Sequence, residues 1–170
     1  MSPPSTYTSY ERMVGAVNRC IENMDPVVQI THVYDCCSGS DNVPRKDRKY
    51  NHWGGNTYTA EKWSQTSSWR GVLQELEYDL AKLSASDTWN PSRPINMLFL
   101  CKSGRHRSVA SAMFAAWILH TTRRFKVGEW EHLCSRHWRH DFCTTCSECA
   151  GWTDERQALN DDIVESFYAL

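Results

Sequence analysis

Eight residues between an apolar run and a helix-like segment gather the side chains that could bind an anion. They read CKSGRHRS and occupy positions 101–108. A glycine at 104 allows the backbone to turn so that successive N–H groups point inward, and the following helix adds unpaired N–H groups and a positive dipole. The pattern predicts a bound phosphoryl group. The predicted ligand-binding residues of this loop are Lys102, Ser103, Gly104, Arg105, His106, Arg107 and Ser108.

Neighbouring segments are expected to complete this pocket. Ligands of open α/β sheets lie at the carboxyl ends of the strands, and Asp35 follows the first predicted strand. His52 belongs to a long loop, and His137 lies in a stretch rich in cysteine and histidine. We therefore expect these three side chains to line the pocket together with the 101–108 loop.

The loop also contains the spacing Cys-x5-Arg, from Cys101 to Arg107, followed by Ser108. This spacing resembles the signature of cysteine-dependent phosphatases, whose loop also joins a strand to a helix. A cationic helix N-terminus favours the thiolate form of cysteine, which is the nucleophile, and an arginine can bind phosphate through two hydrogen bonds. In such an enzyme Cys101 would attack, Arg107 would bind the phosphoryl group, and Ser108 would assist the leaving thiolate. Three aspartates are candidates for the general acid: Asp35, Asp41 and Asp47.

A closer resemblance covers the run LFLCKSGRHRSVASA at 98–112. It resembles the C-terminal domain of the bacterial RNase-adapter protein RapZ family, which carries a strand, then Cys-Thr-Gly-Gly-Lys-His-Arg-Ser-Val, then a helix. Lys102-Ser103 replaces Thr-Gly, and Arg105 stands for the lysine. Weaker matches, Asp35 and the pair Arg136-His137, extend the resemblance over roughly 27–140. The loop positions that match are Cys101, Gly104, His106, Arg107, Ser108 and Val109.

The resemblance implies a small α/β domain whose anion pocket senses a phosphorylated amino sugar and takes part in small-RNA binding. The expected ligand is therefore a phosphorylated metabolite or a nucleotide or RNA end. The chain contains neither G-x-x-x-x-G-K-[S/T] nor G-x-G-x-x-G. Their absence disfavours P-loop ATP hydrolysis and Rossmann-type dinucleotide binding.

A second group of candidate ligands forms a ladder of cysteine and histidine at every third position. Such C-x2-C and C-x2-H spacings suit tetrahedral zinc. The preferred set is His140, Cys143, Cys146 and Cys149, and rival sets exchange His140 for His137 or Cys149 for Cys134. The deaminase and H-E-x-x-H signatures are absent, which favours a structural zinc over a catalytic one. Such a zinc would attach the tail and the last helix to the sheet.

The long loop before residue 59 mixes basic and aromatic side chains, a combination that can hold single-stranded RNA by stacking beside a cationic track. This predicts, as a third possibility, a zinc-containing RNA-binding module. The alternative is a lid over the anion pocket with Gly54-Gly55 as its hinge. The basic and aromatic residues of the loop are Arg45, Lys46, Arg48, Lys49, Tyr50, His52, Trp53 and Tyr58.

These residues must be positioned by elements that the hydrophobic pattern predicts. Strands that alternate with helices indicate a three-layer, mostly parallel α/β sheet with flanking helices and right-handed crossovers. Ser67 or Ser68 is expected to cap the second helix and Thr153 the last. The predicted elements are a helix over 7–24, a strand over 27–34, an irregular segment over 35–66, a helix over 67–83, a strand over 95–100, a helix over 108–120, a strand over 126–134 and a helix over 154–170.

Composition supports a single domain over 1–170, with a core over about 7–134 and a Cys/His-rich, metal-binding extension over 135–170. The formal net charge of −1 gives no bulk attraction for a polyanion, so any basic function must be local. The chain has no apolar run long enough for a membrane span and no secretory signal at its start. Eight cysteines without an export signal favour metal ligands or free thiols over disulfides. A cytoplasmic or nuclear location is expected.

Overall fold

The protein is a mixed α/β structure with a small parallel sheet. The computed structural model describes residues 15, 17–19, 21–22, 29–38, 42–44, 46, 51–86, 93–102, 104–122, 125–128, 133, 143, 146–150 and 153–170. Two strands, β1 (His32–Asp35) and β2 (Met97–Leu100), pair in parallel with His32 opposite Met97 and Asp35 opposite Leu100. The helices are α2 (Thr57–Ser64), α3 (Ser67–Ala85), α4 (Arg107–Thr122), α5 (Ser147–Ala150) and α6 (Asp154–Tyr168).

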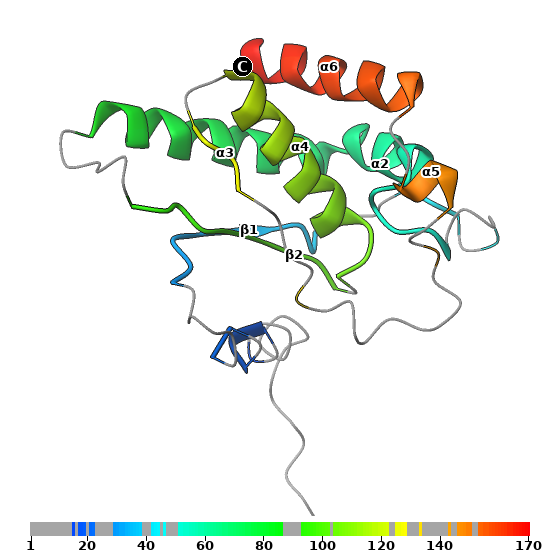
Figure 1. The fold of residues 1–170 in the computed structure, drawn as a ribbon, viewed down its shortest axis with the longest axis horizontal. Coiled ribbons are helices and arrows are strands. Elements are labelled where there is room, and N and C mark those ends of the chain that lie inside the picture. Colours follow the sequence, from blue (N-terminus) through cyan, green and yellow to red (C-terminus); the bar gives the residue numbers. More distant parts are fainter. Residues whose placement is uncertain are drawn as a thin grey trace, which may run out of the picture.

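The chain between β1 and β2 passes through α2 and α3, and these helices lie with α4 and α6 on one side of the sheet (Figure 1). Residues 15, 17–19 and 21–22 have helical backbone, as predicted for this segment, and lie on the other side in the same view. Because β1 and β2 are parallel, their carboxyl ends meet at one edge of the sheet. The segments that follow the two strands therefore begin side by side.

Three helices begin at a side chain that caps the first turn. Thr153 accepts a hydrogen bond from the Arg156 N–H at the start of α6, which confirms the predicted cap. The cap of α3 is Thr66, which accepts from Trp69, rather than Ser67 or Ser68. Asn56 caps α2, which lies inside the segment predicted to be irregular. That prediction was wrong for 57–64, where the capped turn continues as a helix.

The core lies between the sheet and the helices above it. The ring of Tyr34 in β1 stacks on Phe99 in β2 with centroids 4.8 Å apart, and the Tyr34 hydroxyl donates to Asp79 of α3. Trp63 and Trp69 are 0% and 2% exposed, as expected of core residues. Trp69 also packs against Phe114 of α4. Each fully buried large apolar side chain contributes about 1.5–3 kcal/mol relative to exposure, so this cluster fixes α3 and α4 on the sheet.

The sheet of the described residues is smaller than predicted. The strand expected over 126–134 does not form at residues 126–128 or at 133, which have coil and turn backbone. Within the described ranges the sheet therefore contains β1 and β2 alone. None of the helices there combines the length and the apolar character that crossing a bilayer requires.

Candidate anion-binding loop and metal centre

The 101–106 segment is a tight turn from β2 into α4. Gly104 has a φ of 62°, in the left-handed region that glycine adopts without strain. The Gly104 N–H donates to the Cys101 carbonyl at 3.1 Å, and the Ala110 N–H donates to the His106 carbonyl at 2.9 Å as α4 begins. The backbone N–H groups of 107–109 consequently have no acceptor within the helix. This is the strand–turn–helix geometry that the sequence predicted for an anion-binding loop.

The predicted ligand side chains of the loop differ in their burial. Lys102 is exposed, and Gly104 and Arg105 are partly exposed. His106 and Ser108 are 2% and 7% exposed, so they face the interior more than solvent. The prediction for Ser103 falls outside the described residues.

Arg107 joins the two loops at the carboxyl edge of the sheet. Its Nη1 donates to the carbonyls of Cys37 and Ser38 at 2.7 and 3.2 Å. The Cys37 N–H in turn donates to the Asp35 carboxylate at 2.7 Å. The segment that begins at Asp35 therefore lies against the first turn of α4. The guanidinium of Arg107 is turned towards this segment rather than out to water.

Three thiols lie at the same edge. The Cys101 sulfur is 3.2 Å from the Ser108 hydroxyl, and the Cys101 residue is only 3% exposed. The Cys36 thiol lies 3.4 Å from the Ser111 hydroxyl. Burial raises the pKa of both Cys36 and Cys37 to about 12, so these two thiols are protonated at neutral pH. A phosphate ester can reach Cys101 only if the surrounding loops move aside.

A separate group of candidate metal ligands lies close to the start of α2. The ligand atoms of His52, Cys143, Cys146 and Cys149 all lie within 4.8 Å of one another. His52 Nδ1 is 3.0 Å from the Cys149 sulfur and 3.5 Å from the Cys146 sulfur. Tetrahedral zinc holds its thiolates about 3.8 Å apart, given Zn–S bonds of about 2.3 Å. The four residues are therefore close enough to hold a metal ion, and their donors are those that zinc prefers.

Backbone hydrogen bonds bring the two halves of this centre together. The Cys143 N–H donates to the Asn51 carbonyl at 3.0 Å, beside a parallel bridge between His52 and Cys143. The Cys149 N–H donates to the Cys146 carbonyl at 2.9 Å, which forms the turn between the last two thiols. The Trp53 indole donates to the Cys149 carbonyl at 3.1 Å. Burial raises the pKa of the Cys149 thiol, so metal binding must displace its proton.

The centre contains three of the four ligands predicted from the ladder, namely Cys143, Cys146 and Cys149. The fourth predicted ligand, His140, and the alternates Cys134 and His137 lie outside the described residues. His52, predicted for the anion pocket, instead lies among the thiols. It is 97 residues from Cys149 in sequence, so no spacing rule links it to the ladder.

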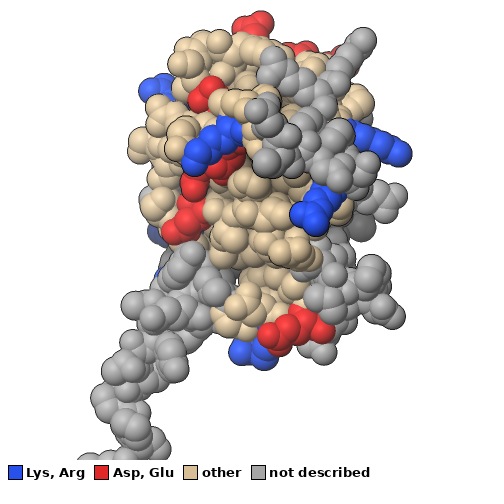
Figure 2. All heavy atoms as spheres, turned by 90° about the vertical axis from the view of Figure 1, so that its left-hand side faces the viewer, with Lys and Arg blue, Asp and Glu red and all other residues tan. Residues whose placement is uncertain are grey.

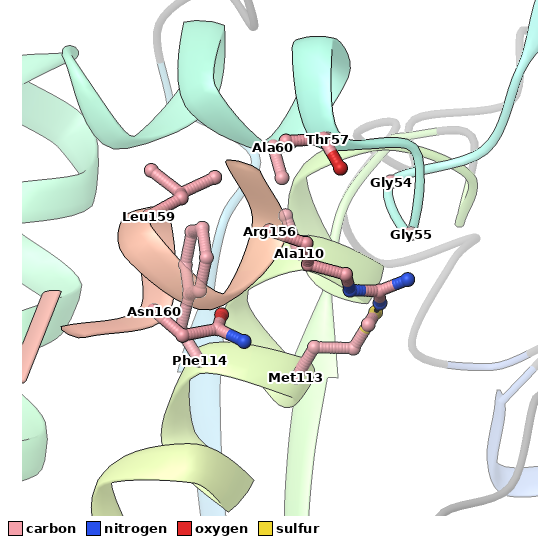
Figure 3. Close-up of a pocket in the computed structure, with 10 residues that line it drawn as sticks. All are labelled: Gly54, Gly55, Thr57, Ala60, Ala110, Met113, Phe114, Arg156, Leu159 and Asn160. Atoms are coloured by element: carbon pink, nitrogen blue, oxygen red, sulfur yellow. Dashed lines mark hydrogen bonds between the residues drawn. The ribbon is translucent and has the colours of Figure 1, made fainter. Parts of the chain in front are cut away.

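A buried arginine lies at the edge of the metal centre. Arg156 is 8% exposed, and its Nη2 lies 3.3 Å from the Met113 sulfur. Burial lowers the pKa of Arg156, whereas the nearby Cys149 sulfur acts in the opposite direction. Figure 3 shows the Arg156 side chain along a cavity of about 10 Å³ among α2, α4 and α6, next to Gly55. Zinc with three thiolates and a neutral histidine carries a net charge of −1, which this guanidinium can balance.

The basic and aromatic loop is only partly described. Lys46 is exposed, while Trp53 uses its indole N–H on Cys149, and Tyr58 lies under the Lys62 ammonium at 5.4 Å. Arg45, Arg48, Lys49 and Tyr50 fall outside the described residues. Figure 2 views the end of the molecule where β1 and β2 begin, away from the 101–108 loop. It shows basic and acidic side chains interspersed. Among the described residues of that face, no patch of a single charge sign is visible.

The chain was compared with family models, curated proteins and solved structures, and none of the three comparisons found a match. Its function is therefore inferred from the chemistry of the 101–108 loop and of the metal centre.

Proposed function

We propose that the 101–108 loop binds the phosphoryl group of a small phosphorylated metabolite or of a nucleotide end. The observation that carries this proposal is the left-handed Gly104, placed between the carboxyl edge of a parallel sheet and the first turn of α4. Backbone N–H groups in such a turn can point to one centre, and the helix dipole favours negative charge there. The exposed Lys102 and the partly exposed Arg105 add positive charge.

In this proposal the residues of the loop divide their roles according to burial. Backbone N–H groups, Lys102 and Arg105 contact the phosphoryl oxygens. Arg107 fixes the segment after β1 through the carbonyls of Cys37 and Ser38 and keeps a positive charge beside the site. The buried His106 maintains the shape of the loop from within.

The resemblance of the loop to the RapZ C-terminal domain supports a phosphorylated amino sugar as the first ligand to test. From the same resemblance we also propose that this chain has the three-layer architecture of that domain and takes part in small-RNA binding. The helical residues at 15–22, on the far side of the sheet from α3 and α4 in Figure 1, are compatible with a third layer.

Phosphatase activity is a second candidate, which the Cys101–Ser108 contact of 3.2 Å favours. The Cys101 thiolate would attack phosphorus while the P–O ester bond breaks, and an acid such as Asp35 would protonate the departing alkoxide. Water would then hydrolyse the phosphocysteine, and the Ser108 hydroxyl would donate to the thiolate that leaves. The burial of Cys101 makes this candidate secondary to binding alone.

We also infer that the metal centre binds one structural zinc ion through His52, Cys143, Cys146 and Cys149. Three thiolates and one imidazole fill the four positions of a closed tetrahedral site, and soft sulfur donors select against magnesium and calcium. The ion would join the chain before α2 to the segment around α5, which lies far away in sequence.

The binding proposal is tested by thermal unfolding with glucosamine phosphate and with unphosphorylated glucosamine. A ligand at 100 times its dissociation constant stabilises a protein by about 2.7 kcal/mol, so the sugar phosphate should raise the melting temperature by several degrees. Lys102→Ala and Arg105→Ala should each reduce the shift, whereas Arg70→Ala, an exposed change on α3, should not. An equal shift with both sugars, or in all three variants, contradicts binding at this loop.

Hydrolysis of an aryl phosphate separates the two candidates. Turnover that disappears in Cys101→Ser while the sugar-phosphate shift persists would establish the phosphatase. A shift without turnover in the wild type would establish a binding function.

A further inference from the structure

The chain that carries the histidine ligand packs directly on the anion-binding loop. The Gly54 N–H donates to the Arg105 carbonyl at 2.7 Å. A Cβ at Gly54 would lie 2.0 Å from the His106 carbonyl oxygen and 2.8 Å from the Ala110 nitrogen, distances that side chains do not reach. Figure 3 shows Gly54 and Gly55 beside Ala110 of α4. Backbone therefore meets backbone at this point, with no flexible side chain between the two segments.

The same short segment is attached to the metal centre on its other side. His52, two residues before Gly54, lies 3.0 Å from the Cys149 sulfur, and the Trp53 indole donates to the Cys149 carbonyl. A Cβ at Gly55 would lie 2.4 Å from the Trp53 ring, so the indole folds tightly over that glycine. A displacement of His52 is consequently transmitted to Gly54 and to the carbonyls of the anion loop.

Hydrogen bonds join this segment to the cysteine cluster within the described residues. They include the bonds from Cys143 to Asn51, from Trp53 to Cys149 and between His52 and Cys149, together with the Asn56–Glu148 pair. Each of these hydrogen bonds replaces hydrogen bonds to water, so its net contribution to stability is small. The bonds of a closed zinc site, in contrast, decide whether small domains fold at all. Metal binding therefore dominates the position of residues 52–54.

We propose that the metal at His52, Cys143, Cys146 and Cys149 is a positional cofactor of the anion-binding loop, acting through Gly54. This inference rests on the proposed function of the 101–108 loop and adds its regulation. The bound metal holds 52–54 against the carbonyls of Arg105 and His106, which keeps the loop and the first turn of α4 ready for the anion. By linkage, metal and anion strengthen each other's binding by the same factor.

The first test compares the zinc-loaded protein with the same protein after chelation. Amide hydrogen exchange should accelerate by about tenfold or more at Gly54 and Ala110, because local opening becomes easier. Amides of α3 from Leu73 to Leu80 should keep their rates and show that the fold persists. The affinity for inorganic phosphate should fall by about fivefold or more, the lower end of coupling between sites.

The outcomes separate this inference from the function on which it rests. Equal phosphate affinity and equal exchange in both forms would overturn the coupling and leave the anion site intact. A zinc-loaded protein that binds no phosphate would overturn the anion site, while the exchange rates at Gly54 and Ala110 would still decide whether the metal positions the loop.

If chelation unfolds the whole chain, a variant that keeps the metal ligands tests the coupling instead. Gly54→Ala keeps all four ligands but pushes the segment away from His106 and Ala110. It should retain one zinc per chain and lose phosphate affinity by about fivefold or more. Gly71→Ala on α3 is the matched control, because a Cβ there would meet no atom within 4 Å, and its phosphate affinity should stay close to that of the wild type. Equal affinities in both variants overturn the proposal.

Discussion

At the scale of single residues, the two candidate sites depend on glycines at positions where a side chain would interfere. Gly104 supplies the left-handed turn of the 101–108 loop, and Gly54 allows the segment that carries His52 to touch that loop. The sequence predicted the first role, since a glycine between a buried strand and a helix marks an anion-binding turn. The sequence did not predict the second, because close approach between segments far apart in the chain leaves no local signal.

The cysteine ligands could be predicted from their local spacing, whereas the distant ligand His52 could not. Their three-residue spacing predicts a metal site, and the structure brings Cys143, Cys146 and Cys149 together. We expect Cys149→Ser to abolish stoichiometric zinc binding, measured by elemental analysis of the purified protein. Cys37→Ser, a thiol outside the cluster, should still bind one zinc per chain. Equal zinc contents in the two variants would show that the ion, if bound, lies elsewhere.

Arg156 provides a test of the charge of the metal centre. The guanidinium is buried and lies within electrostatic range of Cys149. Arg156→Gln should weaken zinc binding by about tenfold, because a centre of net charge −1 would lose its buried counter-charge. Arg156→Lys, which keeps the charge, should lose much less affinity in a competition with a chromophoric chelator. Equal losses in the two variants would show that packing rather than charge is responsible.

At the scale of secondary structure, the helices predicted most accurately are those that bury one apolar face. The helix predicted over 67–83 is α3, from Ser67 to Ala85, and its buried residues lie on one face, namely Trp69, Val72, Leu73, Leu76 and Leu80. Helix α6 and its Thr153 cap are also confirmed. Helix α2 was missed because it is short and buries only Thr59, Ala60 and Trp63, which gives little periodicity. The Asn56 cap was the one local signal that could have revealed it.

The hydrogen bond between β1 and α3 predicts a dependence of stability on pH. Burial, followed by the nearby Asp79 charge, raises the pKa of Tyr34 above its ordinary value of about 10. The neutral phenol therefore stabilises the fold below about pH 10, and this contribution is lost as pH rises further. Tyr34→Phe should cost about 1 kcal/mol at pH 7 in urea unfolding and should show a weaker decline of stability in alkali.

Tyr78 offers the matched control, since it is 57% exposed on the same helix. Tyr78→Phe should change stability by less than about 0.5 kcal/mol. If both variants lose the same stability at pH 7, the Tyr34–Asp79 bond does not contribute as described.

Asn56 links the start of α2 to α5 through Glu148. Its side chain accepts from the Thr59 N–H, donates to Glu148, and is fully buried. Asn56→Ala should cost about 1–2 kcal/mol, the range for a lost N-cap, and should also weaken zinc binding because α5 loses an anchor. Thr66→Ala removes the cap of α3 and should reduce stability in chemical denaturation without changing the zinc affinity. If the zinc affinity is unchanged in both variants, the Asn56–Glu148 contact does not contribute to metal binding.

At the scale of the whole molecule, the parallel pairing of β1 and β2 gathers the functional segments. It places the segment after Asp35 and the loop after Leu100 at one edge, and Arg107 then ties the two together. The sequence predicted this arrangement because buried strands that alternate with helices favour parallel pairing. The strand predicted over 126–134 has no counterpart at the described residues 126–128 and 133. A short apolar run does not by itself determine whether a strand finds a partner.

The most direct test of the anion-binding loop is a titration of the zinc-loaded protein with a sugar phosphate, followed by amide NMR. The N–H resonances of Arg105 and of the first turn of α4 should shift together and saturate, because phosphoryl oxygens accept from them. These shifts should shrink in Lys102→Ala. If the loop resonances do not shift, whether or not other resonances do, the sugar phosphate does not bind at this loop.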